Sequence, residues 1–273
     1  MVIFEFDVQE RLDDIKRHFQ QVLEIKNSLA DNRQKYRNLS NEINISQYSL
    51  FQCCDAFERS LLINCYTFSE QLMKNFIYEA IDKDRHENKF LNKFIDNKIH
   101  KSRFSPNVKF NRMEEDIKKD LLKDFKFILP KSLNEIKIYD EMVNSRHTYA
   151  HRGVYNFDFE NFSAVIKVIE YIYFEFSTII NYDENFRVKF QHDFKEVSSL
   201  SKKISKINEI KYEREKLKEI KKMCKSIVKN YSSKIESIEL FKELYENIKN
   251  VSKMDLRDAK RAQSKVTELS NML

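Results

Sequence analysis

The scarcity of glycine and proline limits the folds open to this chain more than any other feature of its sequence. Its 273 residues contain one glycine, Gly153, and two prolines, Pro106 and Pro130. Tight β-turns and hairpins depend on these residue types, because glycine adopts the left-handed backbone without strain and proline presets the turn conformation. Leu, Lys and Glu, which favour helix, are abundant instead. We therefore expect an all-α fold.

The composition also excludes two broad classes of protein. Hydrophobic residues make up 41% of the chain and include 22 Phe and 13 Tyr, enough to bury a substantial core, so the chain is not intrinsically disordered. No segment offers the roughly 18 uninterrupted apolar residues of a membrane span, and the first ten residues lack the pattern of a secretory signal. We expect a soluble, cytoplasmic protein that does not contact a membrane.

The four cysteines are consistent with that compartment. Cys53, Cys54, Cys65 and Cys224 lack Cys-x-x-Cys spacing, and most of them fall within apolar helical patterns. Such cysteines behave as small core residues in a reducing environment.

Positive charge is concentrated in one segment of the chain. The net charge is +6, and residues 195–229 contain 12 Lys or Arg against 5 acidic residues, so the rest is close to neutral. A basic helix of this kind can follow a phosphate backbone. It can equally be the solvated face of a long helix, and the sequence leaves both interpretations open.

Apolar periodicity predicts two long helices in the N-terminal part. The first begins after Asp7, which can cap it together with Glu10 three residues on, and continues to about residue 43. Its apolar residues recur at intervals of three, four or seven: Val8, Leu12, Ile15, Phe19, Val22, Leu29, Tyr36 and Ile43. The second helix spans 47–82 and has a broad apolar face: Leu50, Cys54, Phe57, Leu61, Cys65, Phe68, Leu72 and Phe76. That breadth predicts a central core helix.

Residues 84–130 show a weaker pattern, which predicts an insertion or lid. Two shorter helices are expected near 87–101 and 113–127, separated by Ser105-Pro106-Asn107. Several basic residues of this segment could contact an anionic ligand: Lys98, His100, Lys101, Arg103, Lys109 and Arg112.

The remaining sequence predicts further helices in two domains. One helix begins near Ser132 or Asn134 and stops at Gly153; the next, capped by Asp158, runs from Phe159 to about Ile180. This second helix is apolar on most sides, so we expect protein all around it, from its own bundle or a second subunit. We expect a helical domain over 1–189, with its core at 45–182, and a basic C-terminal helical hairpin or coiled-coil appendage over 190–273.

The segment from Arg146 to Gly153 concentrates polar side chains at a predicted helix end. It reads Arg-His-Thr-Tyr-Ala-His-Arg-Gly, so Arg146 and His151 have an R-x4-H spacing. On a straight helix their side chains lie about 140° apart. Both can reach one phosphate only if the helix end at Gly153, the length of the Arg146 side chain, or a second subunit across a two-fold axis brings them together.

An arginine paired with a histidine suits RNA cleavage by the RNA's own 2′-hydroxyl, a reaction that needs no metal or cofactor. Histidine exchanges protons near neutral pH, and a guanidinium can hold the phosphate and stabilise the charge of the transition state. In this interpretation His151 is the general acid or base and Arg146 binds the scissile phosphate, supported by His147, Tyr149 and Arg152. The structural alternative is a helix-end histidine that interacts with the terminal carbonyls.

A metal site is the weaker interpretation of the two histidines. His147 and His151 have the i,i+4 spacing of H-E-x-x-H zinc sites, but Thr148 stands where that motif has glutamate. No third ligand is evident from the sequence, so we expect no bound metal.

In these features the chain resembles the HEPN superfamily, named for higher eukaryotes and prokaryotes nucleotide-binding domains. The resemblance rests on the long apolar helix that contains Glu70, the R-x4-H stretch at a helix end, and the strongly apolar helix that follows. It covers roughly residues 45–182 and implies an HEPN-like helical bundle. Carried over, Arg146 and His151 match the catalytic motif, and Glu70 matches a helix acidic residue of some members. The residue after the motif arginine is often Asn or Asp in the family and is His147 here.

The resemblance also implies a function and partners. Many HEPN members are metal-independent endoribonucleases that act as homodimers, with the motifs of both subunits lining a shared cleft. They serve in toxin–antitoxin and phage-defence systems, so a substrate of single-stranded RNA or tRNA and an antitoxin or defence partner protein are expected. Some members are inactive, and a noncatalytic module that binds RNA or protein is the alternative. A purely structural coiled coil is a third interpretation, which the aromatic composition disfavours.

Overall fold

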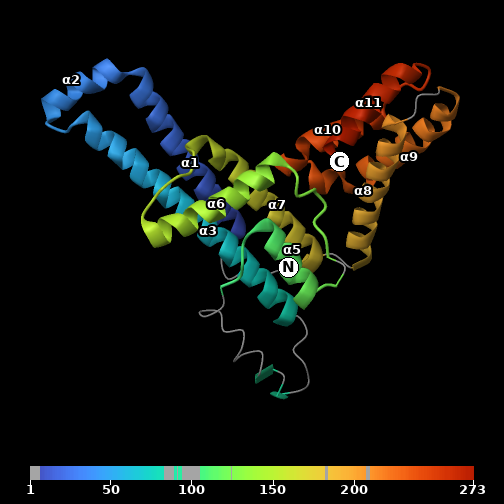
Figure 1. The fold of residues 1–273 in the computed structure, drawn as a ribbon, viewed down its shortest axis with the longest axis horizontal. Coiled ribbons are helices and arrows are strands. Elements are labelled where there is room, and N and C mark those ends of the chain that lie inside the picture. Colours follow the sequence, from blue (N-terminus) through green and yellow to red (C-terminus); the bar gives the residue numbers. More distant parts are fainter. Residues whose placement is uncertain are drawn as a thin grey trace. The chain divides into compact units, whose positions relative to one another are not determined.

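The computed structural model describes residues 7–82, 89–90, 92–93, 105–123, 125–181, 184–206 and 210–273, and throughout these ranges the regular secondary structure is helical (Figure 1). The all-α expectation is confirmed. The first helices are α1 (Val8–Asp31), α2 (Arg33–Ile43), α3 (Gln47–Asp82), α5 (Phe110–Asp120) and α6 (Asn134–Arg152). The later ones are α7 (Phe162–Asn181), α8 (Glu184–Ser205), α9 (Ile210–Ile235), α10 (Glu239–Ser252) and α11 (Ala259–Met272). No helix within the described ranges is both long enough and apolar enough to cross a membrane.

The chain divides into two compact units. Unit 1 comprises residues 1–125 and 131–169, and unit 2 comprises residues 126–130 and 170–273. The division therefore falls within α7, rather than at residue 189 as the change in composition predicts. Composition does not reveal this boundary, because the apolar pattern of α7 continues unchanged across it.

In unit 1, α1 begins as predicted. The Asp7 carboxylate accepts hydrogen bonds from the backbone N–H groups of Gln9 and Glu10, at 2.9 and 3.0 Å. The helix then buries the first part of the predicted stripe: Val8, Leu12, Ile15, Val22 and Leu29. The continuous helix predicted to residue 43 is wrong, because the chain breaks at Asn32 (φ −117°, ψ 31°) and α2 buries none of its residues. Its composition explains this, since α2 is mostly polar and has little apolar surface to bury.

The prediction for the second long helix is confirmed, and α3 is the central helix of unit 1. From Cys54 onward it buries a continuous face that packs on α1 and α6 (Figure 1). The fully buried members are Leu61, Leu62, Cys65, Phe68, Leu72, Met73 and Phe76. One predicted core residue, Phe57, lies outside the core, since it is 46% exposed, and the nearby Phe51 is 39% exposed. The apolar face of α3 is therefore wider than its neighbours cover.

α5 and the residues just before it are packed into unit 1. α5 begins three residues earlier than predicted and ends at Asp120, with Phe110, Met113 and Ile117 buried. The Phe110 N–H donates to the Asp140 carboxylate at 2.8 Å, and the Tyr139 hydroxyl donates to the Val108 carbonyl at 2.9 Å. Most of the predicted helix near 87–101 lies outside the described residues. The same is true of four of the basic residues named above: Lys98, His100, Lys101 and Arg103.

α7 is buried on most sides within its own chain, one of the two surroundings expected for it. It is preceded by a 3₁₀ turn (Phe159–Asn161), and the Asp158 side chain makes no capping hydrogen bond, so the predicted side-chain cap is wrong. Only the Asp158 carbonyl takes part, accepting from Asn161 N–H at 3.1 Å.

Unit 2 is a four-helix arrangement joined by the second half of α7, and it is more than the hairpin or coiled coil expected. α8 contacts α9 and α11, and α10 contacts α9 and α11 (Figure 1). Aromatic rings fill its core: Tyr171, Phe190, Phe194, Tyr231 and Phe241.

A buried ion pair attaches residues 126–130 to unit 2. Arg187 Nη1 lies 2.7 Å from Glu175 Oε2, and both side chains are buried. Glu175 also accepts from the Ile128 N–H at 2.9 Å, while Arg187 donates to the Lys126 carbonyl at 3.1 Å. These bonds explain why a segment between α5 and α6 belongs with the later helices.

Candidate functional site

The R-x4-H segment lies at the C-terminal end of α6, which remains a regular helix through Arg152. Gly153 then adopts the left-handed conformation (φ 68°, ψ 8°), and its N–H donates to the Tyr149 carbonyl at 2.9 Å. This is the usual use of glycine after a helix, and the predicted stop is confirmed.

Arg146 continues the core-facing side of α6. Tyr139 and Met142, at earlier positions on that side, are fully buried, and Arg146 is partly buried. The guanidinium carbon of Arg146 lies 4.0 Å from the centroid of the Tyr66 ring on α3. A cation over an aromatic face is attracted by the ring quadrupole. The packing of α3 on α6 therefore holds the motif arginine at the edge of the core.

His147 and His151 lie one turn apart on the exposed side of α6. Their ring centroids are 4.4 Å apart with an interplanar angle of 54°, and both residues are exposed, as is Arg152. Because α6 stays regular between Arg146 and His151, their side chains leave the helix about 140° apart. The helix end therefore does not bring Arg146 and His151 together. The His151 ring lies against the His147 ring instead.

The Tyr149 ring contacts a polar network that sequence reasoning missed. It packs edge-to-face on Tyr155, with centroids 6.5 Å apart, and the Tyr155 hydroxyl donates to Glu58 at 3.4 Å. Lys26 Nζ lies 2.5 Å from the same carboxylate. Burial and the Glu58 charge raise the pKa of Tyr155, so it stays protonated at neutral pH. The network attaches the chain after Gly153 to α1 and α3.

One sequence signal for this network exists. Lys26 interrupts the apolar stripe of α1, and its ammonium group also lies 4.5 Å from the centroid of the Phe159 ring. A partly buried lysine within an apolar stripe usually has a charged partner, but the sequence does not show which acidic residue supplies it.

Glu70 lies on the same side of α3 as Tyr66, one turn further on. Within the described residues its carboxylate pairs with Lys74 Nζ at 2.8 Å and accepts from the Ser105 hydroxyl at 3.0 Å. Glu70 therefore lies one turn from Tyr66, and these two bonds go to residues outside the motif.

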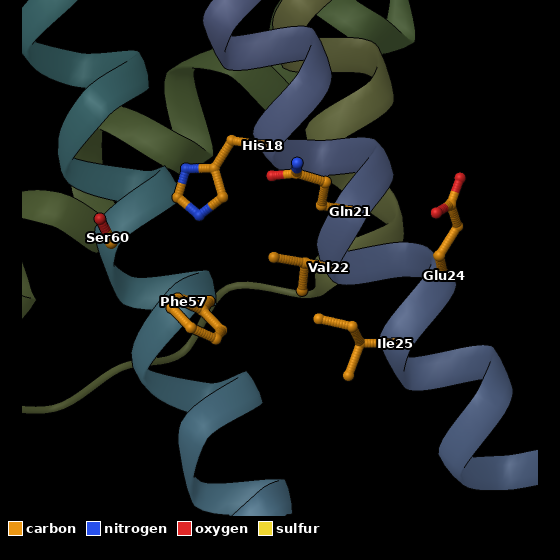
Figure 2. Close-up of a pocket in the computed structure, with 7 residues that line it drawn as sticks. All are labelled: His18, Gln21, Val22, Glu24, Ile25, Phe57 and Ser60. Carbon is orange, nitrogen blue, oxygen red and sulfur yellow. The ribbon is translucent and has the colours of Figure 1, made fainter.

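A groove of about 490 Å³ lies between α1 and α3, and the His18 and Phe57 side chains point into it (Figure 2). The two rings meet edge-on with centroids 6.4 Å apart, and burial lowers the pKa of His18. Phe57 precedes Tyr66 by nine residues, about two and a half turns, so the groove opens on the other side of α3 from Tyr66. Sequence reasoning did not single out His18, which lies among the apolar positions of α1.

No group of three or more His, Cys, Asp or Glu side chains with the arrangement of a metal site occurs among the residues that the structure describes. The four cysteines are free, and Cys54, Cys65 and Cys224 are buried. Burial raises the pKa of Cys224 to about 12, so its thiol is inert at neutral pH.

In comparisons with known proteins, no family model, curated protein or solved structure matched the chain.

Proposed function

We propose that unit 1 is a metal-independent endoribonuclease domain of HEPN type, which cleaves single-stranded RNA or tRNA. The observation that carries this proposal is the pair of exposed imidazoles of His147 and His151, on the same helix as an Arg146 guanidinium that lies over the Tyr66 ring. Imidazoles transfer protons near neutral pH, and arginine binds phosphate with a permanent charge.

The reaction is an in-line attack within the RNA. His151 removes the proton of a ribose 2′-hydroxyl, and the resulting oxygen forms a bond to the adjacent phosphorus. The bond from phosphorus to the 5′-oxygen of the next nucleotide breaks, and a second imidazole donates a proton to that oxygen. The products are a 2′,3′-cyclic phosphate and a 5′-hydroxyl. Arg146 binds the phosphate and stabilises the charge of the pentacoordinate transition state.

A second copy of the chain completes the site in this proposal. Arg146 and His151 leave a regular helix about 140° apart, so one α6 presents them in different directions. Across a two-fold axis, His151 of one copy can approach the phosphate that Arg146 of the other copy binds. The proposed active form is a homodimer that acts as a toxin or phage-defence effector, restrained by an antitoxin-like partner protein.

The direct test is RNA cleavage by the purified protein in excess EDTA. We expect wild-type protein to cleave, and His151→Ala or Arg146→Ala to lose about 10²- to 10⁴-fold in rate. His192→Ala is the matched control, because His192 is an exposed histidine on α8. If both motif variants bind RNA and cleave it as fast as wild type, the proposed site is wrong. Binding without turnover by the wild-type protein favours the noncatalytic module.

A further inference from the structure

α9 has two faces of opposite character in unit 2. Its inner face is completely buried through Leu217, Ile220, Cys224 and Ile227. Its outer face carries four exposed lysines, at intervals of four, three and four residues, which place them in one row along the helix. This α9 lysine stripe consists of Lys218, Lys222, Lys225 and Lys229.

Acidic residues are absent from most of this helix. From Ile220 to Ile235 the sequence has five lysines and no Asp or Glu. Glu219 lines a groove of about 320 Å³ together with Asp193 and Glu196 of α8. Lys222 lines this groove as well, but the other three stripe lysines do not. The acidic residues of α9 therefore all precede Ile220, and three of the stripe lysines, Lys222, Lys225 and Lys229, lie on the stretch of the helix that has no carboxylate.

Several lysines of unit 2 have an intramolecular partner among the described residues, and the stripe lysines do not. Lys242 pairs with Glu239, Lys249 pairs with Glu246, and Lys221 donates to the Met254 carbonyl. In the part of the chain that the structure describes, none of the four stripe lysines makes an ion pair or a side-chain hydrogen bond. Four neighbouring ammonium groups thus remain available to an external anion.

We propose that the α9 lysine stripe binds the phosphodiester backbone of a nucleic acid strand. Its ends are eleven residues apart, about 16 Å along the helix, and adjacent members have Cβ atoms about 5–6 Å apart. A row of evenly spaced cations is complementary to a row of evenly spaced phosphates, and each contact releases condensed counterions. The stripe belongs to unit 2 and the R-x4-H segment to unit 1, so binding by the stripe does not depend on the proposed nuclease activity.

Two other anionic partners fit this surface less well. A helix that lies on a membrane inserts apolar side chains between its basic residues, but the apolar face of α9 is occupied by the core of unit 2. Interfaces between proteins are depleted in lysine and are centred on apolar or aromatic side chains. The stripe offers neither an apolar centre nor a membrane anchor.

The test compares binding of a fluorescent single-stranded RNA 20-mer by two charge-matched variants, both in a His151→Ala background so that the RNA stays intact. One variant changes all four stripe lysines to Gln. The control changes four exposed lysines elsewhere to Gln: Lys35, Lys118, Lys137 and Lys260. Anisotropy is measured from 50 to 200 mM salt, with a DNA 20-mer of the same sequence in parallel to distinguish RNA from DNA as the strand bound.

We expect the stripe variant to lose at least about tenfold in affinity and to lower the slope of log K against log salt by about 3, as four lost phosphate contacts require. Changing the four lysines to Arg should retain binding. Equal losses in the stripe and control variants would show that only net charge matters and would overturn the proposal. So would stripe-dependent binding to phosphatidylserine vesicles without binding to either nucleic acid.

Discussion

Gly153 is the residue whose backbone most clearly explains its identity. It has φ 68°, and a Cβ atom added there would meet no heavy atom within 4 Å. The requirement for glycine is therefore one of backbone conformation, not of space. Gly153 affects Arg152 and the residues before it only by ending α6 at this position.

We predict that Gly153→Ala lowers the free energy of unfolding by about 1–2 kcal/mol, because an L-residue with a Cβ atom is strained in the left-handed region. Gly153→Asn should lose less, since asparagine tolerates that region better. Urea denaturation of the two variants and wild type measures the difference. An alanine variant as stable as wild type would show that the helix ends differently.

Tyr66 is predicted to position Arg146, because its ring lies 4.0 Å from the guanidinium carbon. Tyr66→Phe keeps the aromatic face and should retain RNA cleavage near the wild-type rate. Tyr66→Leu removes the face, and we expect a drop in the cleavage rate of about five- to thirtyfold, the equivalent of the 1–2 kcal/mol of a desolvated cation–π contact. A structural role alone predicts lower stability with unchanged cleavage, so rates are measured at a temperature where all three proteins are folded.

His18 gives the stability of unit 1 a predicted pH dependence. Burial lowers its pKa from the ordinary 6.5, so the unfolded chain binds the proton more tightly than the folded protein. The free energy of unfolding should therefore fall as the pH drops through and below 6.5, with no contribution from His18 at higher pH. Denaturation between pH 5 and 8 should show a shallower fall for His18→Gln. The control His192→Gln changes an exposed histidine and should show the same fall in the free energy of unfolding as wild type. If His18→Gln also falls as steeply as wild type, the prediction is contradicted.

Among the elements, those with a strong apolar period were predictable and the others were not. The bounds of α3 and the ends of α6 follow from the sequence, because a broad apolar stripe and a lone glycine dictate them. The break at Asn32 and the shift of α5 do not, since α2 has no buried face and α5 begins where Asp140 accepts its first N–H. Tertiary contacts decide such weakly patterned segments.

The pairing of α7 with α8 depends on the buried ion pair of Glu175 and Arg187, which also holds residues 126–130. We predict that Arg187→Met lowers the free energy of unfolding of unit 2 by about 3–5 kcal/mol, because it leaves the Glu175 carboxylate buried without its partner. The double variant Arg187→Met with Glu175→Gln should recover part of that loss. Chemical denaturation measures both, and a loss below about 1 kcal/mol for Arg187→Met would show that the pair contributes little.

For the whole molecule, the sequence predicted an all-α chain and the residues of a candidate site but not the division into units. The boundary lies inside α7, where apolar residues continue on both sides. The sequence placed Arg146 and His151 near the end of a helix, as α6 has them, but gave no indication of their contacts. The Tyr66 face and the Glu58 network come from helices distant in sequence, and no spacing within α6 indicates them.

The central proposal is that Arg146 of one chain and His151 of another form one RNA-cleaving cleft. The most direct test mixes purified Arg146→Ala and His151→Ala proteins, each inactive alone, allows their subunits to exchange, and then measures RNA cleavage. Heterodimers contain one cleft with both wild-type side chains, so we predict that the mixture regains part of the wild-type cleavage rate in EDTA and produces 2′,3′-cyclic phosphate ends. If exchange is verified by mass spectrometry of the intact dimers and the mixture stays inactive, the shared cleft is contradicted.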